Sequence, residues 1–284
     1  MRRVDAKGLA DRAQVERARH QSVDAVFEMV ERDGEVGGGI IAGALAYRLF
    51  IWLLPLALVC VAGLGFASEA ASQTPEESAE SLGMEGLISS SITGAARSPN
   101  RWYALLIGIP IVVWATRSML RVLIGAHRLI WMDERAAAPK PTLLASLRLL
   151  VLLLSFGVVT TFAGALRSWS SGPGLLATLA ALLAYAALWL LISVELPHRG
   201  THWEALVPGA LLFGVGLDAL NVVIAYVITP WALAKEGTYG ALGVAAALLV
   251  GLFLISRLAV ATAVLNATLS ERASPRSSRL ISTR

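Results

Sequence analysis

The stretch GALAYRLFIWLLP, residues 43–55, lies within an apolar run from Ile40 to Phe66 whose one charged residue is Arg48. About 20 consecutive apolar residues are enough for a helix to cross the hydrocarbon core of a bilayer. The run is longer than that, so it predicts a membrane-spanning helix. A guanidinium inside such a span is costly unless water, an anion or another polar group reaches it. The rest of the chain therefore has to account for Arg48.

The composition of the whole chain agrees with a membrane protein. Of its 284 residues, 56% are hydrophobic and 15% are charged, and the mean hydropathy is +0.66. Soluble domains usually carry about 25% charged residues. The single cysteine, Cys60, excludes an internal disulfide bond and a cysteine-based metal site. The pI near 9.6 does not predict nucleic-acid binding, because the basic residues flank the apolar runs, where membrane topology accounts for them.

The apolar runs predict an all-α, polytopic membrane protein with six transmembrane helices. The expected spans, which form a transmembrane domain over 40–268, cover residues 40–66, 103–131, 142–166, 174–196, 205–229 and 239–268. The second span is the least regular, because Arg117, Arg121 and Arg128 follow its charge-free part. It can cross a bilayer only if these three side chains face protein or water.

The distribution of Lys and Arg sets the expected orientation. Fourteen of these residues lie in the N-terminal segment, the second and fourth connections and the tail, against four in the other connections. Positive residues near span ends remain on the cytoplasmic side. Both termini are therefore expected in the cytoplasm, which agrees with an even number of spans. The polar N-terminus does not resemble a cleavable signal peptide, so the first span is expected to act as an uncleaved anchor.

Three polar segments flank or interrupt the spans. The N-terminal cytoplasmic segment, residues 1–39, contains a periodic stretch over 13–33 that predicts either an amphipathic helix at the membrane or a plain solvated helix. An extracytoplasmic loop is expected over 67–102, with a short helix starting at Thr74. A basic cytoplasmic tail covers 269–284. Small residues at four-residue spacing also predict close helix contacts in spans one and six: Gly39, Gly43, Gly243, Ala247 and Gly251.

Six polar residues inside the expected spans form the candidate ligand-binding residues: Arg48, Arg117, Arg121, Asp218, Asn221 and Arg257. At the helical rise per residue, the charged ones lie roughly 12–20 Å above the cytoplasmic edge, within a core about 30 Å thick. Two interpretations remain open. In the first, Asp218 bonds Arg257 or Arg48 and the other arginines bond helix-end carbonyl groups or snorkel inward, so the charges are structural. In the second, the excess positive charge lines a water-filled cavity for an anion, such as a phosphate headgroup.

Enzyme motifs give no support for catalysis. His198 and His202 in HRGTHWE, residues 198–204, are four apart, but Pro197 and Gly200 favour a loop, and the segment lacks the glutamate of H-E-x-x-H. The sequence has no G-x-S-x-G elbow, no phosphate-binding loop and no nucleotide fingerprint. We therefore expect no enzyme activity, no metal or other cofactor, and no nucleic-acid partner.

Three motifs resemble those of the YihY/virulence factor BrkB family. AGALAYRLFIWLLPLALV (42–59) is similar to the family's first span, with Ala46 and Tyr47 before a Leu-rich run that ends in Pro55. LPHRGTHWEALVPGALL (196–212) resembles its Leu-Pro, short basic connection and Pro-Gly-Ala. TYGALGVAAALLVGLFLISRLAVATAVLNATL (238–269) resembles its last span, with a late asparagine at Asn266. The resemblance runs in order over residues 15–270.

The resemblance implies a bacterial inner-membrane protein with six helices, both termini in the cytoplasm, and an envelope or virulence-linked role. Two places depart from the family: Gly251 stands where a mid-span Trp is common, and residues 261–264 lack a Gly-Ala-Glu before the late Asn. Some relatives have been labelled ribonuclease BN, but this sequence has no acidic or histidine cluster suited to a nuclease.

The leading functional hypothesis combines the resemblance with the charges inside the spans. In this hypothesis the protein binds or transports an anionic envelope component, a lipid or a small anion, through a positively charged intramembrane cavity. The alternative is a structural or scaffold membrane protein whose buried charges stabilise the bundle. Membrane lipids are the expected partners in both cases.

Overall fold

The computed structural model describes residues 21–70, 101–132, 134, 138–168, 174–199, 202–224 and 241–273. Every regular element in these residues is helical: α2 (Gln21–Glu35), α3 (Gly38–Ala70), α6 (Arg101–Met132), α7 (Leu143–Ser168), α8 (Gly174–Glu195), the 3-10 turn η2 (Trp203–Leu206), α9 (Val207–Val223) and α11 (Ala241–Ala273). All the α-helices except α2 are part of a span long and apolar enough to cross a membrane, with η2 and α9 counted as one span. The expected all-α fold with six candidate spans is confirmed.

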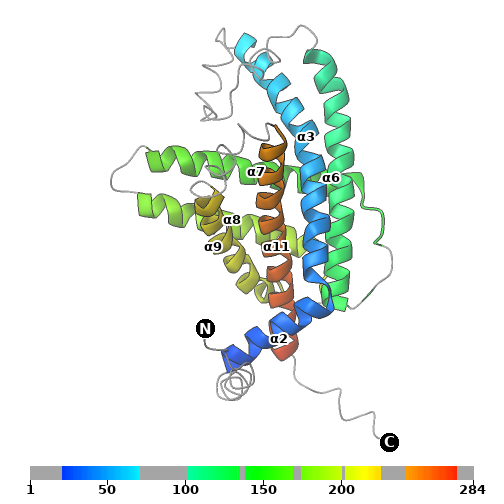
Figure 1. Cartoon of the computed structure of the whole chain (residues 1–284), viewed down its shortest axis with the longest axis vertical. Helices are drawn as coiled ribbons and strands as arrows, with labels where there is room; N and C mark the ends of the chain where they lie inside the picture. Colours follow the sequence, from blue (N-terminus) through cyan, green and yellow to red (C-terminus); the bar gives the residue numbers. More distant parts are fainter. Residues whose placement is uncertain are drawn as a thin grey trace, which may run out of the picture.

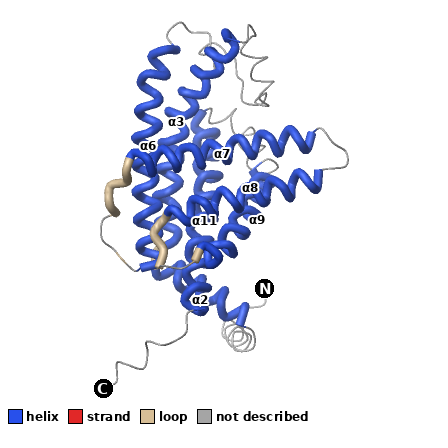
Figure 2. The backbone as a smooth tube through the Cα atoms, turned by 180° about the vertical axis from the view of Figure 1, so that it is seen from behind, coloured by secondary structure: helices blue, strands red, loops and turns tan. Residues whose placement is uncertain are grey.

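The spans form two groups that cross each other (Figure 1). α3 packs along both α6 and α11, and the three run in a similar direction. α7 and α8 lie crosswise to them, and α8 packs between α7 and α9. α9 also packs along α11, so it joins the two groups. The view from behind in Figure 2 shows the same crossing, with α2 at one end of the bundle.

Three of the spans are longer than a perpendicular crossing requires. α3, α6 and α11 contain 33, 32 and 33 residues. At the helical rise per residue each is about 50 Å long, whereas the hydrocarbon core is about 30 Å thick. Such helices must tilt or extend beyond the core. Counting residues from a helix end therefore overestimates how deep a side chain lies in the membrane.

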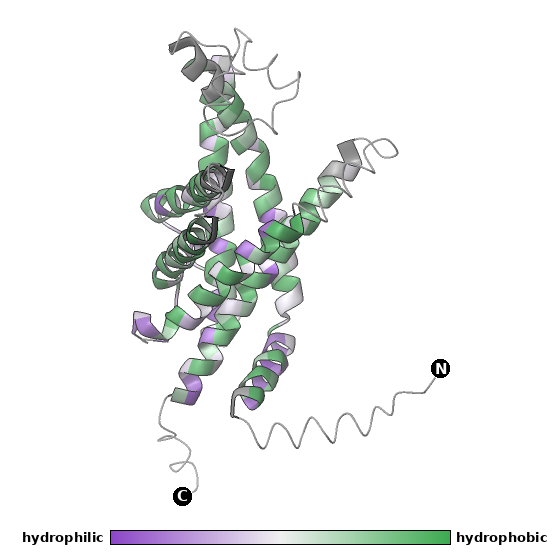
Figure 3. Ribbon diagram, turned by 90° about the vertical axis from the view of Figure 1, so that its left-hand side faces the viewer, coloured by the Kyte–Doolittle hydropathy of each residue, from purple (hydrophilic) through white to green (hydrophobic). Residues whose placement is uncertain are grey.

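The distribution of hydropathy separates α2 from the spans (Figure 3). The spans are hydrophobic along most of their length, while α2 mixes polar and apolar residues. Many large apolar side chains on the spans are exposed, for example Leu106, Val158 and Leu176. An apolar surface of that extent is unsuited to water and suited to contact with lipid.

The helix bounds agree closely with the expected spans. The fourth span was expected over 174–196, and α8 covers Gly174–Glu195. α2 covers the later part of the helix expected over 13–33. The earlier part, the short helix expected at Thr74 and the tail after Ala273 lie outside the described residues, as does the expected end of the fifth span at residue 229.

Close helix contacts do not occur at the glycines that the spacing predicted in span one. A Cβ added at Gly39 or Gly43 would meet no atom of a described residue within 4 Å. A Cβ at Gly214 of α9 would instead lie 2.5 Å from the backbone oxygen of Leu182 in α8. The prediction for span one was wrong because small residues are abundant in this chain, so their spacing does not identify the face that packs.

Gly214→Leu is expected to lower the free energy of unfolding by about 2–3 kcal/mol, because the side chain would push against the backbone of α8 rather than against a flexible side chain. The measurement is unfolding by dodecyl sulfate in detergent micelles, followed by circular dichroism. Gly164→Leu on α7 is the control, since a Cβ there meets no atom within 4 Å. Equal unfolding midpoints for the two variants would show that α8 and α9 are not in close contact at Gly214.

Candidate functional site

Basic side chains gather on the outer face of α6. Arg117 and Arg121 are both exposed, and residues four apart share a helix face. The connection to α7 passes along this face, because Arg117 Nε donates a hydrogen bond to the carbonyl oxygen of Pro141 (3.0 Å). Lys140, the residue before Pro141, is also exposed. We call Arg117, Arg121 and Lys140 the α6 basic face.

The bond to Pro141 sets the level of Arg117 relative to the next span. α7 begins at Leu143, so Arg117 lies close to the level at which the chain starts its third crossing. α6 continues from Arg117 to Met132, which is about 20 Å further along the helix. The α6 basic face therefore lies beside the start of α7, well before the end of α6.

Arg257 of α11 forms a bidentate ion pair with Asp33 of α2. Its two terminal nitrogens lie 2.8 and 2.5 Å from the two carboxylate oxygens of Asp33. The Asp33 side chain is 16% exposed, and a Cβ at Gly38 would overlap its carboxylate. Glycine at the first residue of α3 thus leaves room for this acid.

The partner of Arg257 differs from the expected one. The first interpretation paired Arg257 with Asp218, inside the spans, whereas the structure pairs it with an acid that precedes the first span. The reason is that α2 packs against α11, which brings the segment before α3 alongside the middle of the last helix. Arg257, like Arg117, therefore lies level with a place where a neighbouring span begins.

The remaining candidate residues are not gathered into one site. Arg48 is half-buried on α3 and makes no hydrogen bond or ion pair with another described residue. Asp218 is half-buried on α9. Asn221, also on α9, donates a long hydrogen bond of 3.4 Å to the Tyr185 hydroxyl, which lies 2.9 Å from the Thr160 hydroxyl. Of the six candidates, Asn221 alone is part of the wall of the cavity at the centre of the bundle.

That central cavity has a volume of about 240 Å³. All six spans contribute to its wall, which is apolar except for Thr160, Asn221 and Ser256 and contains no charged side chain from the described residues. Ser256 Oγ is buried and has no hydrogen-bond partner among them. The cavity differs in this way from the positively charged one that we expected, because the arginines lie on other faces of their helices.

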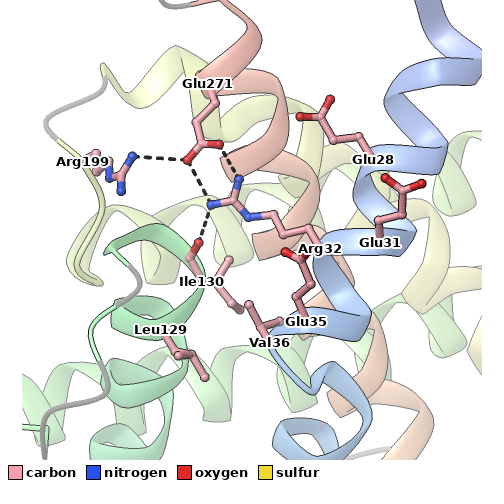
Figure 4. Close-up of a pocket in the computed structure, with 9 residues that line it drawn as sticks. All are labelled: Glu28, Glu31, Arg32, Glu35, Val36, Leu129, Ile130, Arg199 and Glu271. Atoms are coloured by element: carbon pink, nitrogen blue, oxygen red, sulfur yellow. Dashed lines mark hydrogen bonds and ion pairs between the residues drawn. The ribbon is translucent and has the colours of Figure 1, made fainter. Parts of the chain in front are cut away.

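A larger pocket of about 710 Å³ lies at the end of the bundle beside α2 (Figure 4). Four glutamates and two arginines supply its charged side chains: Glu28, Glu31, Glu35, Glu271, Arg32 and Arg199. Arg32 crosses between elements, since it donates hydrogen bonds to the Ile130 carbonyl oxygen (2.6 Å) and to Glu271 (2.7 Å). Arg199 approaches the same carboxylate at 3.3 Å. These bonds connect α2, α6, α11 and the segment after α8.

We did not predict this network from the sequence. Arg32 and Glu271 are 239 residues apart, so nothing local indicates that they meet. The available signal was the spacing of charges on α2, where Asp24, Glu28 and Arg32 follow one another at four-residue intervals on one face. A solvated helix shows the same pattern, so the spacing alone does not reveal a partner.

Asn266 joins α11 to the start of α9. Its Oδ1 accepts a hydrogen bond from the Gly209 N–H (2.7 Å), and its Nδ2 donates one to the Leu206 carbonyl oxygen (3.1 Å). Asn266 is 2% exposed, and a Cβ at Gly209 would overlap its amide. The side chain thus satisfies one of the free N–H groups of the first turn of α9. The Pro-Gly-Ala motif and the late asparagine, which carry the family resemblance in separate parts of the chain, are in direct contact.

The histidines of HRGTHWE show structural contacts where they are described. His198 Nδ1 lies 2.8 Å from the Leu196 carbonyl oxygen, and the ring centroid lies 6.2 Å from that of Trp131. Within the described part of the chain, no group of three His, Cys, Asp or Glu side chains is arranged to hold a metal ion. These contacts hold His198 against the end of α8 and Trp131 of α6.

The fold and these contacts define a helical membrane protein with six candidate spans and an N-terminal helix tied by ion pairs to the last span. The chain matches the Virulence factor BrkB family over residues 31–283. It belongs to that family, which is the one that the motifs indicated. No match was found among curated proteins or among solved structures.

Proposed function

We propose that the protein binds an anionic membrane lipid at the α6 basic face. The observation that carries the proposal is the state of the two arginines. Arg117 uses Nε for Pro141, which leaves both terminal nitrogens without a bond to a described residue. Arg121 is exposed and makes no such bond at all. A guanidinium can bind a phosphate by two parallel hydrogen bonds, and basic residues at the boundary attract anionic headgroups by about 1 kcal/mol each.

The proposal places the protein in the bacterial plasma membrane with both termini in the cytoplasm. Arg272, near the end of α11, bonds Asp24 and Glu28 of α2 at 2.5 and 2.6 Å. This supports placing the N-terminal helix and the end of the last span on one side. The bias of Lys and Arg supports the cytoplasmic side, so the α6 basic face would meet the inner leaflet. We propose no catalytic or ribonuclease activity, and no nucleic-acid partner.

In the double variant Arg117→Gln/Arg121→Gln, the ratio of the affinities for phosphatidylglycerol and phosphatidylcholine is expected to fall by at least about tenfold. Two headgroup contacts of about 1 kcal/mol each correspond to such a change in affinity. The measurement is native mass spectrometry of the protein titrated with each lipid. Arg121→Gln alone keeps the Pro141 contact, so a smaller loss in this folded variant separates lipid binding from stability.

Arg148→Gln is the matched control for this experiment. Arg148 is an exposed arginine on α7, 3.2 Å from Glu195, so its charge is already partly balanced. Its replacement is expected to leave the lipid preference unchanged. An unchanged preference in the folded α6 double variant would contradict the proposal.

A structural role is the second candidate function. The observation in its favour is that two of the arginines bond protein groups from other elements, Arg257 with Asp33 and Arg117 with Pro141. In a scaffold of this kind the charges hold the bundle together and lipids act only as solvent. Arg117→Gln would then lower stability while the preference for phosphatidylglycerol stays the same.

A further inference from the structure

We propose that the central cavity is a second binding site, for a neutral single-chain amphiphile whose hydroxyl or carbonyl group bonds Ser256. It is separate from the α6 basic face. Met119 and Leu123 of α6 line the cavity, while Arg117 and Arg121 are exposed on a different face of that helix. The ligand would differ in class as well as in place, because one site offers cations and the other offers apolar walls with a few neutral polar groups.

The walls of the cavity suit a hydrocarbon chain. Trp189 and Phe213 stack with their ring centroids 4.2 Å apart, and Phe156 lies edge-on to Phe213 at 5.9 Å. Trp189 Nε1 is already bonded to Thr262 (3.0 Å), so the ring offers the cavity an apolar surface. Drug-sized ligands occupy pockets of about 300–1,000 Å³. The cavity, at about 240 Å³, has room for part of one chain rather than for a two-chain lipid.

Ser256 supplies a polar group that the protein itself does not use. Buried serines on these helices otherwise bond the carbonyl four residues earlier, as Ser193 does with Trp189 at 2.8 Å. Ser256 is 1% exposed, lies in the cavity wall and has no such bond with a described residue. Leaving a buried hydroxyl unsatisfied is unfavourable, so a ligand that supplies a hydrogen bond there gains affinity.

The other polar groups of the wall come from α9 and α7. Where α9 packs on α11, Gly216 lies against Leu258, and Ile224 lies near Gly251. Asn221 and Ser256 fall between these two contacts, so they lie at a similar level along the helix pair. Asn221 and Thr160 both approach the Tyr185 hydroxyl, which adds α7 to this group. The polar end of a ligand therefore has several neutral partners in one region, while its chain contacts the aromatic rings.

The cavity opens to the surface of the spans along α7. Gly157 and Thr160 line the cavity and are also exposed. The exposed surface of these helices is apolar and suited to lipid contact, as described above. A molecule dissolved in the bilayer can thus enter sideways, without passing through water.

Photolabelling with diazirine-bearing hexadecanol tests the proposal on the full-length protein in nanodiscs. Gly157→Leu places a side chain into the cavity where a Cβ meets no atom within 4 Å, so the variant should fold while labelling of the cavity falls at least about tenfold. Gly164→Leu, on the same helix with equally open surroundings and outside the cavity wall, is the matched control and should keep wild-type labelling. Equal labelling of both variants, or labelled peptides that contain no cavity residue, would overturn the proposal.

Ser256→Ala tests the polar contact separately. Labelling by the hexadecanol probe should fall by about threefold to tenfold, the range of one neutral hydrogen bond, while labelling by a diazirine-bearing hexadecane should not change. The same response to both probes would overturn the role of Ser256, and stronger labelling by the corresponding hexadecanoate would overturn the choice of a neutral ligand. The α6 double variant should label like wild type, so this proposal and the proposed lipid site can fail independently.

Discussion

Asn266→Ala is expected to lower the free energy of unfolding by about 2–4 kcal/mol. The substitution removes two hydrogen bonds and leaves the Gly209 N–H and the Leu206 carbonyl without this buried partner. Each buried group left unsatisfied costs about 1–3 kcal/mol, and little water is available inside a helix bundle to replace the amide. The measurement is unfolding by dodecyl sulfate in micelles, with the fraction folded followed by tryptophan fluorescence.

Thr268→Val is the control for Asn266. Thr268 is equally buried, on the same helix, but its hydroxyl bonds the Val264 carbonyl within α11. Its replacement removes a bond inside one helix and should cost less than about 1 kcal/mol. If Asn266→Ala unfolds at the same detergent fraction as Thr268→Val, the contact between α9 and α11 does not depend on the asparagine.

Asp33→Ala and Arg257→Ala are each expected to lower the free energy of unfolding by about 1–3 kcal/mol, and the double variant by less than their sum. The bidentate geometry makes this a strong type of ion pair, and removing one partner leaves a partly buried charge without compensation. We expect a coupling energy of at least about 1 kcal/mol from the double-mutant cycle. Dodecyl sulfate unfolding of the four proteins supplies the four free energies.

The pair Arg148–Glu195 provides the matched cycle. Its side chains are 58% and 49% exposed, and exposed pairs contribute about 0–1 kcal/mol. If the coupling energy for Asp33–Arg257 is no larger than that for Arg148–Glu195, the side chains of Asp33 and Arg257 are not held together. A change in lipid binding on Arg257→Ala without coupling to Asp33 would instead favour a ligand role for that arginine.

The positions of the spans could be predicted because burial in lipid requires a continuous apolar segment of known length. The boundaries of α8 show how closely this works. The crossing of the two groups of spans could not be predicted, because a helix that is apolar on most sides does not reveal which face packs. The close contact at Gly214 follows from that crossing and was missed for the same reason.

The candidate residues could be chosen from the sequence, whereas their surroundings could not be predicted. Charged residues inside apolar runs are visible in any sequence, and their cost in lipid marks them for attention. Their depth was estimated for helices perpendicular to the membrane, whereas Arg117 and Arg257 lie level with the starts of neighbouring spans. Ser256 has no sequence signal, since its one distinguishing property is the absence of a described partner. Asn266 was singled out by the family resemblance alone.

The attachment of α2 to α11 has a consequence for how the protein is made. Asp33 and Arg257 are separated by 224 residues, and Asp24 and Arg272 by 248. At about 5–20 residues per second, the ribosome needs on the order of 10–50 s after it has synthesised α2 to reach the residues of α11 that pair with it. Asp33 and Asp24 therefore cannot pair with Arg257 and Arg272 until the last helix has been made, so docking of α2 onto α11 is among the final steps of folding.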